Sequence, residues 1–218
     1  MSKENWFLII LILLLAFLPL TESRFYVFLG TDILIMGLFA VSLNLLLGYT
    51  GLVSFGQAAY FGIGAYTCAL LMKKASVAFP LAFAAAAVFG AIAAMIIGFF
   101  CIRLTKIYFA MLTLAFSQIV WAIAFKWNSL TGGDTGLIGV NFPAHLDSPI
   151  RFFYFTLAVV ALSFYVLRKL VNSPFGRILT TIRENPERTE FIGINVKLFQ
   201  LIAFMISGFF AAIAGALF

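Results

Sequence analysis

The stretch NSPFGRILTTIRENPERTEFIGINVK, residues 172–197, is a charged island within an otherwise apolar chain. It holds about a third of all charged residues, and apolar segments long enough to cross a membrane flank it on both sides. Arg168 and Lys169 stand just before it. Because basic residues are enriched in cytoplasmic loops, we predict that the island lies in the cytoplasm, which orients the rest of the chain.

The composition around the island is that of a membrane protein. Hydrophobic residues make up 64% of the chain, charged residues only 10%, and phenylalanine occurs 27 times. One spanning helix needs roughly 20 mostly apolar residues. Such windows, the third of them short, lie at residues 6–22, 25–47, 58–72, 79–101, 107–126, 151–171 and 198–218. The sequence therefore predicts an all-α fold, a polytopic transmembrane helix bundle forming one domain over residues 1–218.

The basic residues also predict the sides of the other connections. With the island inside, residues 127–150 lie outside, and Arg103 returns to the inside. Lys3 leaves the N-terminus in the cytoplasm, and the basic pair at 73–74 is an exception on the outer side. The window 6–22 could instead be a secretory signal peptide, but no small-x-small cleavage site follows it, so we favour a retained first helix.

Several function classes are disfavoured. The net charge of +6 is spread over loop ends rather than gathered in a basic patch, so we expect no nucleic-acid partner. Cys68 and Cys101 are isolated thiols, and His145 is a lone histidine in a loop, so neither a metal site nor a disulfide is indicated. We find no nucleophile with a nearby base and no phosphate-binding glycine loop, so the chain is not predicted to be an enzyme or to hold a cofactor.

The segment SLNLLLGYTGLVSFGQAAYFGIGAY, residues 42–66, predicts a broken or short helix near 48–72. Glycines that permit unusual backbone angles alternate there with polar groups that lipid cannot satisfy, and irregular backbone at membrane depth is tolerated only inside protein or beside a cavity. We predict that this segment lines a translocation pathway through Asn44, Gly48, Gly51, Ser54, Gly56, Gln57 and Gly62. The alternative is that the glycines only let helices pack and that the amides bond across an interface.

A second set of pathway candidates lies on the predicted helix at 107–126. Thr113 and Ser117 share one face at a spacing of four residues, and Gln118 follows directly. An amide is harder to satisfy in a membrane than a hydroxyl. The alternative for the two hydroxyls is a bond to the backbone of their own helix.

The island itself predicts two short helices. Ser173 followed by Pro174 is a good helix start, with the serine hydroxyl accepting a bond from a free amide. Asn185 repeats this signal before a second helix at 186–192, which Gly193 should end in the left-handed conformation. From the residues alone, an ordinary solvated loop is the alternative.

Five motifs together resemble bacterial branched-chain amino acid ABC transporter permeases, closest to the M-type subunit. They are SLNLLLGYTGLVSFGQAAYFGIGAY at 42–66, RLTKIYFAMLTLAFSQIV at 103–120, TGGDTGL at 131–137, SPFGRILTTIRENPERTEFIGINV at 173–196 and FMISGFFAAIAGAL at 204–217. Members of this family are usually longer. Because this chain stops at Phe218 within an apolar segment, the resemblance implies C-terminal truncation.

The resemblance implies an assembly in the bacterial inner membrane. Its other members would be a related H-type permease, two ABC ATPase subunits that hydrolyse ATP, and a periplasmic or lipid-anchored substrate-binding protein. It also implies that residues 172–197 form a cytoplasmic coupling loop, in which a short helix docks on the ATPase. The matching positions are Glu187, Arg188, Thr189 and Gly193, with Arg188 and Thr189 departing from the two alanines usual in the family.

Three interpretations of function remain open at this point. The favoured one is a permease subunit of an ATP-driven importer. The second is a self-sufficient channel or secondary transporter for a small neutral solute, which would need ionisable groups at membrane depth, where only Asp32 comes close. The third is a fragment that only inserts and packs. The resemblance implies leucine, isoleucine or valine as substrate, although related permeases carry other amino acids, urea or amides.

Overall fold

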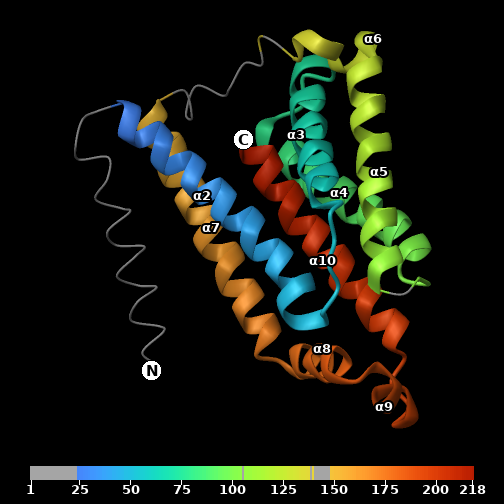
Figure 1. The fold of residues 1–218 in the computed structure, drawn as a ribbon. Helices are drawn as coiled ribbons and strands as arrows, with labels where there is room; N and C mark the ends of the chain where they lie inside the picture. Colours follow the sequence, from blue (N-terminus) through green and yellow to red (C-terminus); the bar gives the residue numbers. More distant parts are fainter. Residues whose placement is uncertain (1–23, 105, 138, 140–147) are drawn as a thin grey trace.

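The computed structural model describes residues 24–104, 106–137, 139 and 148–218, and this part of the chain contains helices and no strand. The predicted window 6–22, Lys3 and His145 lie outside it. The helices, shown in Figure 1, are α2 (Arg24–Asn44), the π-helix η2 (Leu45–Thr50), α3 (Gln57–Lys74), α4 (Phe79–Cys101), α5 (Lys106–Lys126), α6 (Asn128–Thr131), the 3-10 helix η3 (Gly133–Thr135), α7 (Pro149–Val171), α8 (Pro174–Glu184), α9 (Pro186–Phe191) and α10 (Val196–Leu217).

Within the described residues, five helices are long and apolar enough to cross a membrane. These are Arg24–Thr50, Phe79–Cys101, Ile107–Lys126, Pro149–Val171 and Val196–Leu217. They coincide with five of the predicted windows, and the short third window is α3. The prediction of an all-α polytopic bundle is therefore confirmed. In Figure 1, α8, α9 and the turn between α4 and α5 lie toward one end of the bundle, and α6 lies at the opposite end.

The centre of the bundle is α10. It packs against α4, α3 and α2, and 56% of its most apolar window is buried, compared with 17% for α5. Small residues allow this close packing. A β-carbon added to Gly64 of α3 would lie 2.6 Å from Cα of Ala212 on α10, and nearer still to its carbonyl oxygen. The packing alternative that the sequence left open for glycines thus holds at Gly64.

The predicted break is present and lies between η2 and α3. The helix that begins at Arg24 widens into a π-turn and ends at Gly51, which takes a left-handed φ of 71°. Three donors then share the carbonyl oxygen of Leu46: the amides of Gly51 and Leu52 and the hydroxyl of Thr50. Residues 51–56 run without helix back into the bundle, where α3 starts at Gln57. Along this irregular stretch Leu52, Ser54 and Gly56 are buried in protein, while Val53 and Phe55 are exposed.

Candidate functional site

A buried polar junction joins three helices where α3 begins. The side-chain nitrogen Nε2 of Gln57 donates to Ser42 Oγ on α2 at 3.0 Å and to Ser207 Oγ on α10 at 2.8 Å. Ser207 Oγ in turn donates to the carbonyl oxygen of Ser42 at 2.6 Å. Gln57 Oε1 is buried without a hydrogen-bond partner among the described residues. The structure places Gln57 across a helix interface, and its part in a pathway remains a prediction.

The irregular segment 51–56 is fastened to α5. The amide of Phe55 donates to Thr113 Oγ1 at 3.2 Å, and the Thr113 hydroxyl donates to the carbonyl of Ala110 in its own helix at 2.8 Å. The backbone bond considered for Thr113 is therefore present. Gly56, whose amide donates to Ser54 Oγ at 3.3 Å, packs so tightly that an added β-carbon would lie 2.8 Å from the Thr113 carbonyl oxygen. The predicted residues Ser54, Gly56 and Thr113 therefore make contacts that hold the segment 51–56 against α5.

Three other predicted residues meet in a hollow of about 430 Å³ between α3, α5 and α6. Gly62 contributes from α3, and Ser117 and Gln118 contribute from α5. The wall is otherwise largely apolar and aromatic, with Trp121 and Tyr66 among its side chains. An apolar hollow with a few polar groups is the usual form of a small-molecule site.

The loop TGGDTGL contributes its first residue, Thr131, to the wall of this hollow. Thr131 is buried in the wall, and its hydroxyl donates to the carbonyl oxygens of Ala124 at 2.5 Å and Trp127 at 2.9 Å. The amide of Gly133 donates back to Thr131 Oγ1 at 3.3 Å. The short helices α6 and η3 are thereby held against the end of α5.

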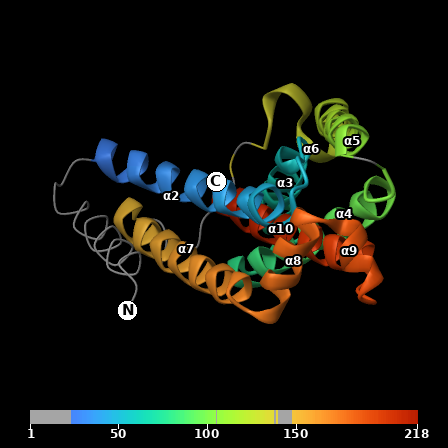
Figure 2. The same ribbon diagram turned by 60° about the horizontal axis from the view of Figure 1, so that its bottom comes forward.

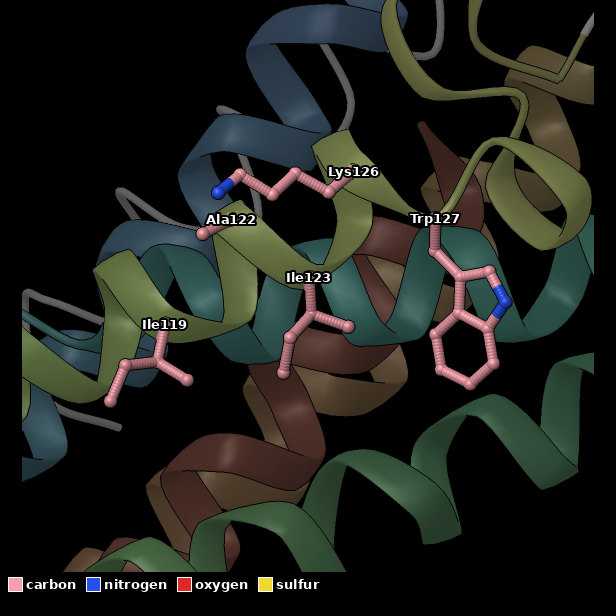
Figure 3. A pocket seen from close by; sticks show the side chains of 5 residues that line it. All are labelled: Ile119, Ala122, Ile123, Lys126 and Trp127. Atoms are coloured by element: carbon pink, nitrogen blue, oxygen red, sulfur yellow. The ribbon is translucent and has the colours of Figure 1, made fainter.

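Figure 3 shows a second hollow, about 460 Å³, which lies along α5. The side chains of Ile123 and Trp127 lie on the same side of α5, and the side chain of Lys126 points away from them. Apart from Lys126 its lining is apolar, the other residues being Ile119, Ala122, Ile123 and Trp127. It therefore offers an apolar surface but no set of polar groups for a small molecule.

The remaining predicted pathway residues lie away from both hollows, at the end of the bundle where α8 lies. Asn44 is exposed in the last turn of α2. Gly48 accepts a hydrogen bond at its carbonyl oxygen from Arg183 Nη1 of α8. A β-carbon added to Gly51 would lie 3.1 Å from Arg183 Cγ. Of the ten candidates, only Gly62, Ser117 and Gln118 line the two hollows described here, and the pathway role of the ten stays a prediction.

The first helix of the island begins at Pro174 as predicted, but the predicted cap is wrong. Ser173 has extended backbone and no side-chain capping bond. Its hydroxyl instead donates to the carbonyl of Leu170, at the end of α7, at 2.5 Å. A serine near a helix end can bond the carbonyl three residues earlier, and here that bond forms in place of the capping bond.

The second helix has the predicted signals at both ends. Asn185 Oδ1 accepts from the amide of Arg188 at 3.0 Å. Gly193 has a φ of 87°. Its amide donates to the carbonyl oxygen of Glu190 at 2.9 Å, and the amide of Ile194 donates to the carbonyl oxygen of Thr189 at 3.3 Å. These two bonds form a Schellman motif. The helix ends at Phe191, one residue earlier than predicted.

The four predicted coupling positions differ in exposure. Glu187, Arg188 and Gly193 are exposed, while Thr189 is fully buried and its hydroxyl donates to the Asn185 carbonyl at 2.8 Å. The sequence reasoning did not consider Phe191, which is 90% exposed at the end of α9. Its position just before the predicted glycine stop was the available signal.

Sequence reasoning also missed Ser42, Ser207 and Arg183 as contacts of predicted residues. Nothing local marks Ser207 as the partner of a residue 150 positions away. For Arg183 the sequence did offer a faint signal. Leu179 and Ile182 give its short helix an apolar face, which indicates that the helix packs against the bundle.

A bundle of membrane-length helices with one broken helix, a hollow beside it and a pair of short helices at one end has the architecture of a multi-pass membrane transport protein. The chain belongs to the family described as "Branched-chain amino acid transport system / permease component", whose match covers residues 25–218.

Relatives of known name agree with this assignment. The chain is 30% identical, over 99% of its length, to the high-affinity branched-chain amino acid transport system permease protein LivM of Escherichia coli. It is 26% identical, over 82% of its length, to the probable branched-chain amino acid transport permease protein LivM of Methanocaldococcus jannaschii. The probable LivH of that organism is also 26% identical, over 83% of the chain. The chain spans 57%, 62% and 61% of these relatives' lengths, and no solved structure matches it.

Proposed function

We propose that this chain is the transmembrane permease subunit of an ATP-driven importer for branched-chain amino acids. Residues 1–218 form one permease domain in the bacterial inner membrane, with the N-terminus and the coupling loop 172–197 in the cytoplasm. Separate ABC ATPase subunits hydrolyse ATP. A second related permease and a periplasmic or lipid-anchored binding protein complete the assembly. Family membership and the names of the relatives support the substrate class.

The observation that carries the proposal is the exposed apolar end of α9. Phe191 and Ile192 are 90% and 70% exposed, and α9 belongs to the most highly charged loop of the chain, where water rather than lipid should surround it. Asn185 and Gly193 fix the helix at its two ends. Exposed apolar side chains on a fixed helix are typical of a protein-binding site, which supports docking of an ATPase here.

The hollow between α3, α5 and α6 is proposed as part of the substrate path. The Gln118 amide and the Ser117 hydroxyl can bond the charged groups of a zwitterion, and the apolar wall suits an aliphatic side chain. A self-sufficient ion-coupled transporter is less favoured. Asp32, the one acidic residue in the five described spans, is exposed on α2 rather than enclosed with a partner.

The test is copurification of the full-length permease with its ATPase and partner permease from membranes. Changing Phe191→Ser together with Ile192→Ser should abolish ATPase binding and leave the partner permease bound. The matched control is Leu104→Ser, because Leu104 is 44% exposed in the turn between α4 and α5, toward the same end of the bundle. If the double variant retains the ATPase as wild type does, α9 is not the docking element.

A further inference from the structure

The helix α8 is part of the bundle rather than a loop in solvent. Its side chains Leu179 and Ile182 are buried in the central core cluster together with Leu45, Leu46 and Leu52 of the broken span. Figures 1 and 2 both show α8 crossing the end of the bundle beside the turn that ends the broken span. Any displacement of α8 must therefore disturb the residues that surround the helix break.

One polar contact joins α8 to the break itself. Arg183 Nη1 donates to the carbonyl oxygen of Gly48. This carbonyl lies in the last turn of the helix that begins at Arg24, where carbonyl groups lack partners within the helix and the helix dipole is negative. A guanidinium group supplies both a donor and a positive charge there. The aliphatic part of Arg183 also packs over Gly51, the left-handed residue at the break.

The same arginine stands directly beside α9. It lies in the last turn of α8, and Asn185, two residues later, both ends α8 and caps α9. A movement of α9 therefore reaches the break through only two residues of chain. The helix α9 itself packs mainly against α8 and α10, whereas α8 packs against η2.

We propose that Arg183 is the positioning residue that ties movement of the α8–α9 pair to the conformation of the helix break at 48–51. The proposal rests on the proposed function, in which an ATPase moves α9. It assigns to Arg183 a role beyond stabilising a helix end: the bond transmits displacement of the cytoplasmic helices to the irregular backbone inside the bundle.

The contact can be tested by a disulfide in the full-length permease within its assembly. In a chain carrying Cys68→Ala and Cys101→Ala, we expect Gly51→Cys and Arg183→Cys to form a disulfide on oxidation, because the two β-carbons would lie 3.7 Å apart. Gly51→Cys with Arg177→Cys is the matched control, since Arg177 lies about 9 Å further back along α8. Protection of both thiols from maleimide measures the bond. If the 51–183 pair remains reactive, the contact and the proposal are overturned.

The positioning role can be tested in vesicles that contain the complete importer and radiolabelled leucine. We expect Arg183→Met to lower the leucine taken up per ATP hydrolysed about tenfold, the factor for one lost charge-assisted hydrogen bond. Arg183→Lys, which keeps a charged donor, should recover part of this ratio, and Arg177→Met should leave it unchanged. A wild-type ratio in Arg183→Met would show a static contact only and would overturn the proposal.

A separate readout distinguishes failure of this proposal from failure of the proposed function. A wild-type assembly without ATP-dependent leucine uptake would refute the proposed function. The break can then be followed by maleimide labelling of Val53→Cys, a position that is exposed within residues 51–56. We expect Arg183→Met, but not Arg177→Met, to raise its labelling rate, and an equal rate in both variants would overturn the role of Arg183.

Discussion

The sharpest stability prediction compares two glycines that lie two residues apart on α3. Gly64 faces α10 so closely that an added β-carbon would lie 2.6 Å from Cα and 2.7 Å from the carbonyl carbon of Ala212. These are backbone atoms, so no side chain can rotate away. Gly62 has no atom within 4 Å of an added β-carbon. Gly62→Ala is therefore a matched control for Gly64→Ala.

The expected magnitudes follow from two opposing effects. Either alanine should gain up to about 1 kcal/mol of helix stability, because it loses less backbone entropy on folding than glycine does. At Gly64 the helices must also move apart, and overpacking of this kind costs about 1–3 kcal/mol, or more against backbone. We therefore expect Gly62→Ala to be neutral or slightly stabilising and Gly64→Ala to destabilise by about 2 kcal/mol.

Thermal unfolding of the purified chain in detergent, followed by circular dichroism, measures the difference. A change of 1 kcal/mol shifts Tm by about 2–4 °C in domains of this size, so Gly64→Ala should lower Tm by about 4–8 °C. Gly62→Ala should leave Tm equal or slightly higher. Equal Tm values for the two variants would refute the close contact between α3 and α10 on which the reasoning depends.

Three further predictions concern other parts of the molecule. Ser207→Ala removes two buried hydrogen bonds and should destabilise the bundle by about 1 kcal/mol, compared with almost no effect of Ser117→Ala in the same unfolding assay. Gly193→Val forces a β-branched residue into a left-handed backbone position and should reduce the leucine taken up per ATP hydrolysed in vesicles. Gly139→Val, at a similar φ in another loop, should leave this ratio unchanged. Equal ratios in the two variants would count against coupling through α9. Gln118→Leu should reduce leucine uptake without changing the amount of chain inserted, and normal uptake would remove Gln118 from the path.

The helices themselves could be predicted because their signals are local. The apolar window at 79–101 corresponds residue for residue to α4 (Phe79–Cys101). The start of α9 follows from the capping side chain of Asn185, and its end follows from the backbone freedom of Gly193. The cap at Ser173 failed for an equally local reason, since its hydroxyl can instead bond the carbonyl of Leu170 three residues earlier.

The candidate site was less predictable because facing and pairing depend on tertiary structure. Gly62 and Gly64 look alike in the sequence, yet only Gly64 meets α10. Of the polar residues around the break, Ser54 and Gln57 are buried in protein while Asn44 is exposed, and the sequence did not reveal that Gln57 would bond Ser207. Ser117 and Gln118 are joined with Gly62 in one hollow only because α5 lies beside α3.

The central position of α10 also affects how the chain is made. The helices α2, α3 and α4 pack against a segment that is synthesised after all of them. At about 5–20 residues per second, the ribosome needs roughly 6–25 s to proceed from the end of α4 to the end of α10. During that interval Gly64 and Gln57 have no α10 to contact. The early helices must therefore wait in the insertion machinery or lipid in a looser arrangement, and the bundle consolidates only when residues 196–217 arrive.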